Sequence, residues 1–140
     1  MTISRFVSGI PAPKGSSRAI PGRGKRKAIL VASSSAANER AQKSWADAVR
    51  AAFADAGEPV KGPVIVSVAF TFRRPKSHGK AQRATNRHTS QPDLDKLLRC
   101  TLDALSGLAY VDDRQVYGVA AWKHYAEPGE PVGAHIEVSD

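Results

Sequence analysis

The chain has 140 residues and carries 21 Lys and Arg against 13 Asp and Glu, which gives a formal net charge of +8. Its length fits one domain, residues 1–140, with a hydrophobic core of its own, and its charge favours a polyanionic partner such as nucleic acid. One cysteine excludes an intramolecular disulfide framework and any zinc site built from cysteines. No apolar run approaches the roughly 18 residues of a membrane span, and we expect a cytoplasmic protein.

The N-terminal region is predicted to hold a short strand followed by a basic arm. Ile3–Val7 is the candidate strand. Residues 11–36 combine Pro, Gly and Ser with many unopposed cations, which argues against regular structure. We therefore predict a flexible arm that contacts a phosphate backbone, with Lys14 and Arg18 among its DNA contacts.

A helix and a strand are predicted next. Asn38 can cap a helix that runs to about Ala56 and is closed by Gly57. The apolar residues of this helix, Trp45 among them, recur at intervals of three and four, as on a helix that is packed on one side. The β-branched and aromatic run Val64–Phe72 then predicts a buried strand.

Residues 73–91 form a second basic segment, which lies between this strand and an acidic region. They are rich in Ser, Thr, Gly, Asn and Gln and contain no acid. We predict a mobile basic loop. Its expected DNA contacts are Arg73, Arg74, Lys76, Lys80, Arg83 and Arg87.

The C-terminal part is predicted to hold a helix and two strands. From Asp93 onward, apolar residues recur at the helical period, and Gly107 suits the left-handed position past the end of a helix. Val116–Tyr125 and Ala134–Val138 have the composition of strands. The predicted fold class is α+β, with a small mixed β-sheet packed against two α-helices.

Five carboxylates are concentrated in a short span of this basic chain: Asp93, Asp95, Asp103, Asp112 and Asp113. Oxygen ligands suit a hard cation such as Mg²⁺, and the surrounding positive charge suits a polyanion. Asp93 and Asp95 can converge on a cation at the start of the helix, but they can also serve as its cap and first turn. The second pair, Asp112 and Asp113, makes a metal site the better interpretation.

Two other residues of this helix are expected to have structural roles. Asp103 lies one turn after Arg99, so the two side chains can form an ion pair on one helical face. Cys100 falls in an apolar helical pattern and is expected to fill the core rather than to act as a nucleophile.

The segments PDLDKLL, LDALSG and YVDDRQV, in this order, together with the N-terminal GIPAPKGSSR, resemble the RusA family of Holliday junction resolvases from bacteria and their phages. The resemblance covers most of the chain in outline. It implies a Mg²⁺-dependent endodeoxyribonuclease in which Mn²⁺ can replace Mg²⁺. It also implies a homodimer that cuts two opposed strands of a four-way DNA junction by paired symmetric nicks.

Carried over onto this sequence, the family's three catalytic and metal-binding aspartates fall on Asp93, Asp95 and Asp113, while Asp112 is left to support the local structure. The family's functional lysine falls on Arg99, which keeps the positive charge but is a poor proton donor or acceptor. Lys96 is a second candidate for the ammonium and for a DNA contact.

Two further interpretations stay open from the residues alone. A non-catalytic branched-DNA-binding protein would use the same basic surfaces, with the aspartates as caps and surface charge, and would bind with a steep salt dependence but give no metal-dependent product. A calcium-binding loop is disfavoured, because Asp93 and Asp95 are not followed by the Gly and Glu that an EF-hand requires.

Overall fold

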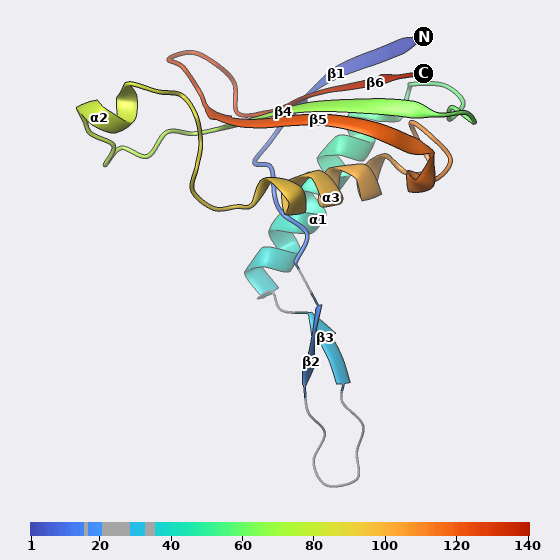
Figure 1. Cartoon of the computed structure of the whole chain (residues 1–140), viewed down its shortest axis with the longest axis horizontal. Coiled ribbons are helices and arrows are strands. Elements are labelled where there is room, and N and C mark those ends of the chain that lie inside the picture. The colour runs from blue at the N-terminus through green and yellow to red at the C-terminus, as the bar shows by residue number, and fades with distance from the viewer. Residues whose placement is uncertain (16, 21–28, 33–35) are drawn as a thin grey trace, which may run out of the picture.

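The structure is a computed structural model that describes residues 1–15, 17–20, 29–32 and 36–140, and for residues 17–20 and 29–32 only the backbone. Figure 1 shows the arrangement of the elements. In chain order they are β1 (Thr2–Ser8), β2 (Ser17–Ile20), β3 (Ile29–Ala32), α1 (Ala36–Phe53), β4 (Val64–Phe72), α2 (Lys80–Arg83), α3 (Leu94–Leu105), the 3₁₀ helix η1 (Asp113–Gln115), β5 (Val116–Tyr125) and β6 (Gly133–Ser139).

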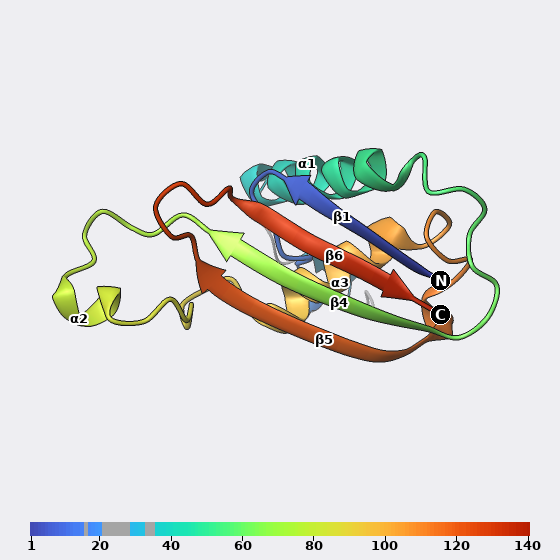
Figure 2. The same cartoon turned by 90° about the horizontal axis from the view of Figure 1, so that it is seen from above.

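The main sheet has four strands in the order β1-β6-β4-β5. β4 and β5 run parallel, whereas β6 pairs antiparallel with both β4 and β1. The helices α1 and α3 lie on one face of this sheet (Figures 1 and 2). The predicted α+β class with a small mixed sheet is therefore confirmed, with α2 as a short additional helix.

The core lies between the sheet and the two long helices. Alternate residues of β4, from Val64 to Phe70, are fully buried, because the period of a strand turns one face toward the helices. Trp45 of α1 is buried among them and donates from Nε1 to Oγ1 of Thr101 of α3 at 3.1 Å. Each such large side chain stabilises the fold by about 1.5–3 kcal/mol through burial, and the expected core role of Trp45 is confirmed.

The strands predicted from β-branched and alternating runs lie where they were expected. Val64–Phe72 and Val116–Tyr125 agree with β4 and β5, while the two shorter predictions fall inside β1 and β6. The bounds of the first helix were wrong, since α1 begins at Ala36, before Asn38, and ends at Phe53 rather than near Ala56. No helix in the described ranges is long and apolar enough to cross a membrane.

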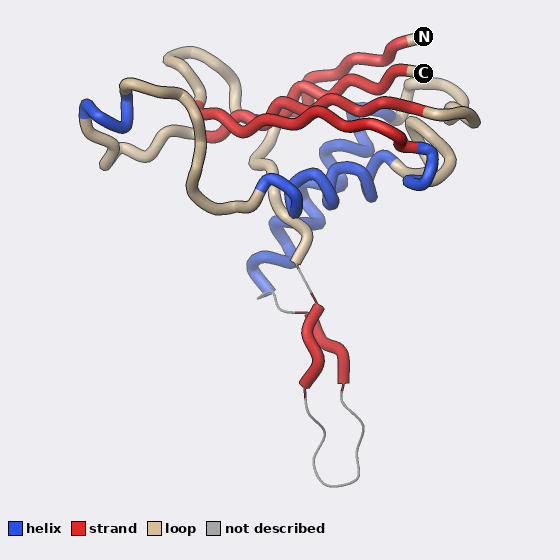
Figure 3. Tube along the Cα trace, in the orientation of Figure 1, coloured by secondary structure: helices blue, strands red, loops and turns tan. Residues whose placement is uncertain are grey.

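Both basic segments contain structure that the composition did not predict. Within the arm, β2 and β3 pair antiparallel, with Arg18 opposite Val31, so the expectation of an irregular arm is wrong for these two stretches (Figure 3). Ile29–Ala32 is an apolar run whose strand propensity was outweighed by the Gly and Pro around it. The loop 73–91 contains α2 and a β-bridge from Arg87 to His124.

Candidate active site

The start of α3 carries the first two aspartates. Asp93 occupies the N-cap position with an extended backbone (φ −67°, ψ 138°), and its carbonyl accepts the first helical hydrogen bond from the N–H of Leu97 at 3.1 Å. Among the described residues, no backbone N–H donates a capping hydrogen bond to its carboxylate. That carboxylate lies 3.6 Å from Nζ of Lys96 instead, so Asp93 is not an ordinary cap.

One face of α3 presents charged side chains to an open hollow of about 250 Å³. Asp95, Arg99 and Asp103 share this face because they lie four residues apart along the helix. The buried residues Leu97, Cys100, Thr101, Ala104 and Leu105 form the opposite face. Asp113, which arrives from the turn before β5, completes the acidic lining.

Asp103 and Asp113 are near neighbours in this hollow. Partial burial of the Asp113 carboxyl is the largest cause that raises its pKa, and its hydrogen bond to and repulsion by Asp103 raise the pKa further. A hydrogen bond with Ser106 acts in the opposite direction. The two carboxyls therefore share a site in which excess negative charge is costly, and a bound cation would relieve that cost.

The turn that carries Asp113 is fixed to the rest of the fold by its neighbours. Asp112 caps η1, because its Oδ1 accepts from the N–H of Arg114 at 3.0 Å. Gln115 donates from Nε2 to the carbonyls of Val60 at 2.7 Å and Gly62 at 2.8 Å, which ties the turn to the segment before β4. Asp112 thus has the local structural role that was expected, and Asp113 is left facing the hollow.

The expected ion pair between Asp103 and Arg99 is wrong. Asp103 pairs with Nζ of Lys14, a residue of the arm whose N–H also donates to the carbonyl of Lys96 at 3.0 Å. No carboxylate in the described part of the chain is ion-paired with Arg99, which lies exposed between Asp95 and Asp103. Arg99 is therefore a cation that is available to an anionic ligand at the acidic hollow.

Cys100 is confirmed as a core residue. It is buried with its Sγ 3.9 Å from the carbonyl of Gln42, and burial raises the pKa of its thiol to about 11. A thiol with that pKa is almost entirely protonated at neutral pH and makes a poor nucleophile.

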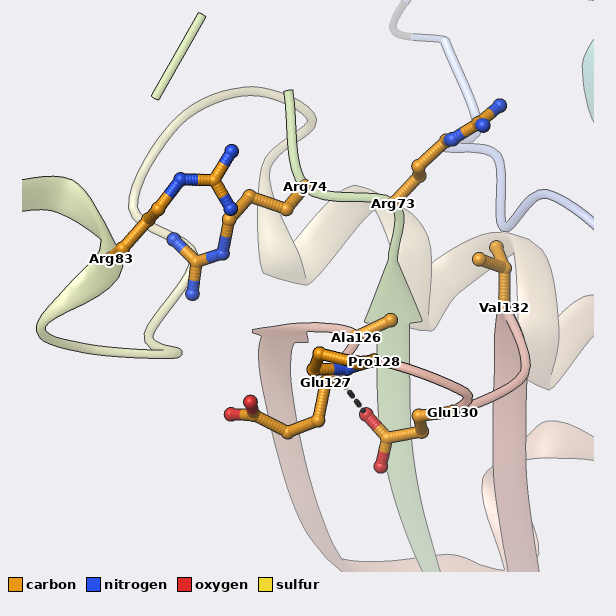
Figure 4. A pocket seen from close by; sticks show the side chains of 8 residues that line it. All are labelled: Arg73, Arg74, Arg83, Ala126, Glu127, Pro128, Glu130 and Val132. Atoms are coloured by element: carbon orange, nitrogen blue, oxygen red, sulfur yellow. Dashed lines mark hydrogen bonds between the residues drawn. The ribbon is translucent and has the colours of Figure 1, made fainter. Parts of the chain in front are cut away.

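The loop 73–91 lies at the end of the sheet where β4 and β5 end, and it leads into α3 (Figures 1 and 2). The guanidinium of Arg74 donates to the carbonyls of Gln82 at 2.9 Å and Thr85 at 2.7 Å and lies 4.8 Å from the centre of the Tyr125 ring. Figure 4 shows the head groups of Arg74 and Arg83 close together, with Arg73 pointing away from both. Arg74 therefore holds the loop together, whereas Arg73 is exposed.

An aromatic cluster supports the same loop. His88 is buried and lies stacked on Tyr125, with ring centroids 4.5 Å apart, while Phe72 lies 4.8 Å away on a tilted plane. Burial, followed by the charge of Lys123, lowers the pKa of His88, so the ring stays neutral at physiological pH. The loop is thus folded around a neutral aromatic core, contrary to a purely mobile segment.

The remaining cations that were predicted to contact DNA are placed as follows. The exposed ones on or near the loop are Arg73, Lys76, Lys80, Arg83 and Arg87, here called the basic loop surface. Lys96 is half-buried beside Asp93. Arg18 lies in β2, and its side chain is outside the described part of the structure, as are those of Arg23, Lys25, Arg26 and Lys27, whereas Lys14 pairs with Asp103.

The donor chemistry of the hollow fits Mg²⁺, with one restriction. In the part of the chain that the structure describes, no three His, Cys, Asp or Glu side chains are close enough together to hold a metal ion. Magnesium is commonly bound by one or two carboxylates, with waters and substrate phosphates as the remaining ligands. Asp103 and Asp113 meet that requirement, with Asp95 on the same hollow and Asp93 outside it.

Asp103 lines the hollow, although the sequence predicted only an ion pair with Arg99 for it. Its signal was present in the spacing of Asp95, Arg99 and Asp103, which shows that all three share one helical face. Asp103 pairs with Lys14 instead of Arg99. Lys14 and Asp103 are 89 residues apart in the sequence.

The chain is basic overall, and the acidic hollow lies along α3, the helix that follows the cationic loop in the sequence. Residues 12–139 match the Endodeoxyribonuclease RusA family, and the chain belongs to that family. Endodeoxyribonuclease is the activity for which this family is named, and resolvases of the family are metal-dependent in general. The chain is also 35% identical over 75 residues to the Uncharacterized protein YqaN of Bacillus subtilis (strain 168), a match that covers 49% of this chain and about half, 53%, of that relative.

Proposed function

We propose that this protein is a Mg²⁺-dependent endonuclease that resolves Holliday junctions and related branched DNA. The observation that carries the proposal is the hollow lined by Asp95, Asp103 and Asp113, with the unpaired Arg99 between them, on a chain of the RusA family. A divalent cation bound there would supply Lewis-acid chemistry and a more acidic water.

The carboxylates of Asp113 and Asp103 are the proposed first ligands, Asp103 through the oxygen that does not pair with Lys14, with Asp95 lining the same hollow. Asp93 is kept as a fourth carboxylate of the site on the strength of the family resemblance, with Lys96 beside it. Arg99 would bind a nonbridging oxygen of the scissile phosphate, which stabilises the charge that develops during cleavage. Arg99 is proposed to act through its charge and its hydrogen-bond donors and not in proton transfer.

The basic loop surface is proposed to hold the DNA backbone. Its exposed cations lie on the segment that leads directly into α3, and a strand bound there is proposed to continue along α3 to the acidic hollow. Contacts of this kind position the duplex without reading its sequence, which suits selection of a branched shape. The arm that contains Lys14 and Arg18 is proposed as a second backbone contact.

A homodimer is proposed because a four-way junction has two equivalent strands to cut. Two copies of the site related by a twofold axis would place one nick in each of two opposed strands. Light scattering after gel filtration, with and without junction DNA, measures this state, and a monomer under both conditions would contradict it.

The function is tested by cleavage of a labelled four-way junction beside a linear duplex of the same sequence, using wild type and Asp95→Asn in Mg²⁺, in Mn²⁺ and in EDTA. We expect paired symmetric nicks in the junction from wild type in Mg²⁺ or Mn²⁺ only. Asp95→Asn should lose at least about 100-fold in rate while it still binds the junction, since the basic loop surface is intact. Junction binding by wild type without nicks in any divalent metal would favour a non-catalytic DNA-binding protein.

A further inference from the structure

The side chain of Lys123 hydrogen-bonds to the backbone of the residues that precede Asp93 and Asp95. Nζ of Lys123 donates to the carbonyl of Ser90 at 2.7 Å and to the carbonyl of Pro92 at 2.7 Å. Lys123 belongs to β5 and is half-buried. Pro92 immediately precedes Asp93, the N-cap of α3, so this contact acts on the residue where the acidic helix begins.

The contact is the last of a series that attaches residues 86–92 to β5. The N–H of Tyr125 donates to the carbonyl of Asn86 at 2.7 Å, and the N–H of His88 donates to the carbonyl of Lys123 at 3.3 Å. These backbone bonds end at His88. Beyond that point the Lys123 ammonium alone, among the described side chains, links the segment to the strand.

The Lys123 ammonium is hydrogen-bonded to these two carbonyls. In the described part of the chain no carboxylate forms an ion pair with it, and its charge lowers the pKa of the neighbouring His88, as a nearby ammonium should. An ammonium has three donors, and two are used here. Hydrogen bonds from a charged donor are stronger than neutral ones, so the contact can fix residues 90–92 against β5.

The second acidic turn is held in the same way. Gln115 donates to two carbonyls and fixes the turn of Asp112 and Asp113, as described above. Lys123 likewise binds the backbone just before Asp93 and Asp95. Lys123 lies in β5, which directly follows η1 and Gln115 in the chain. Each of the two acidic segments is thus held by a side chain that binds backbone carbonyls beside it or in the segment it is tied to.

We infer that Lys123 is a positioning residue of the proposed nuclease, which acts by fixing the start of α3 and hence the carboxylates of Asp93 and Asp95. This inference rests on the proposed function of the acidic hollow. A displacement of about 1 Å in a catalytic group can cost about 100-fold in rate. Lys123 is therefore required for turnover even though it does not line the hollow.

The test compares Lys123→Met, Lys123→Arg and the control Lys61→Met. Methionine keeps the stem but removes the donors, arginine keeps a charged donor, and Lys61 is an exposed lysine outside the site and the basic loop surface. Hydrogen exchange of residues 88–97 in EDTA reports the backbone without DNA or metal. Single-turnover cleavage of the four-way junction and its equilibrium binding in EDTA report catalysis and affinity.

For Lys123→Met we expect faster exchange confined to residues 88–97, a cleavage rate lower by about 10- to 100-fold, and junction affinity within about threefold of wild type, because the phosphate contacts remain. Lys123→Arg should restore protection and part of the rate, and Lys61→Met should match wild type. If Lys123→Met loses protection throughout the protein, Lys123→Arg becomes the deciding variant. Hydrogen exchange like that of wild type together with a full loss of cleavage in Lys123→Arg would then overturn the inference.

Two other outcomes also overturn it. Unchanged exchange with normal cleavage in Lys123→Met would show that the contact has no positioning role. Unchanged exchange with weaker binding and a salt slope smaller by about one would make Lys123 a phosphate contact. If wild type does not cleave any branched DNA, the proposed function fails, but the exchange measurement still reports whether Lys123 fixes this backbone.

Discussion

At the scale of single residues, Asp112 and Asp113 are adjacent acids with different surroundings. Asp112 accepts a capping hydrogen bond from the N–H of Arg114, whereas Asp113 faces Asp103 and the hollow. An asparagine at position 112 can still cap, since Asn and Asp are comparable at such positions. Asp113→Asn should therefore abolish junction cleavage, while Asp112→Asn should keep the rate within about threefold of wild type. Equal loss in both variants would contradict the separation of the roles.

The raised pKa of Asp113 gives a second prediction at this scale. Its pKa is higher in the folded protein than in the unfolded chain, so the ionised carboxyl opposes folding, and this cost disappears as the pH falls through the folded pKa. Without metal, Asp113→Asn should be more stable than wild type at pH 7, and the difference should shrink toward pH 4. Thermal unfolding in EDTA across that range measures it, and a gap that widens on acidification would contradict the sign.

Added Mg²⁺ should remove this difference in stability between wild type and Asp113→Asn. A cation that binds between Asp103 and Asp113 in the native state stabilises wild type by mass action, whereas Asp113→Asn has lost one of the two carboxylates. An equal stabilisation of both proteins by Mg²⁺ would place the ion elsewhere.

Sequence reasoning reached part of this site and missed the rest for a physical reason. The motifs around Asp95 and Asp113 are local and can be recognised one segment at a time. The role of Asp103 depends on Lys14, which comes from the arm, and that of Lys123 depends on carbonyls about thirty residues earlier in the chain. Contacts of this kind follow from the way the sheet and helices are assembled, which no local pattern encodes.

At the scale of elements, the loop 73–91 offers a matched pair of neighbouring arginines. Arg74 binds the carbonyls of Gln82 and Thr85, whereas Arg73 is exposed. Arg74→Gln should destabilise the protein by about 1 kcal/mol and speed hydrogen exchange across residues 78–88. Arg73→Gln should change stability by less than about 0.5 kcal/mol and should lower the salt slope of DNA binding by about one. Equal effects of the two changes on exchange would contradict the structural role of Arg74.

The same loop shows which elements a sequence can predict. Strands β4 and β5 follow from β-branched and aromatic runs, because burial of alternate residues selects such side chains. α2 has four residues and none of them is buried, so it leaves no apolar period to recognise. The pairing of β2 with β3 was hidden in the same way by a composition that favours loops.

At the scale of the whole molecule, the chain has a net charge of +8, but the acidic hollow is lined by three aspartates. The basic loop surface attracts phosphate, but Asp95, Asp103 and Asp113 repel it at the point where cleavage is proposed. A metal cation would remove that repulsion, so DNA should dock fully only when the divalent ion is present.

The double variant Asp95→Asn/Asp113→Asn tests this arrangement. It removes two negative charges from the hollow and keeps every cation of the basic loop surface. In EDTA it should bind the four-way junction about three- to tenfold more tightly than wild type, because each charge near a phosphate costs up to about 1 kcal/mol in water. The salt slope should stay the same, since the slope counts the cations that replace counterions.

Saturating Mg²⁺ should bring wild type up to the affinity of the variant. Anisotropy titrations at several salt concentrations measure all three quantities. Equal affinities in EDTA would mean that the DNA backbone does not approach the acidic hollow, and the basic loop surface would then have to present DNA to another part of the molecule.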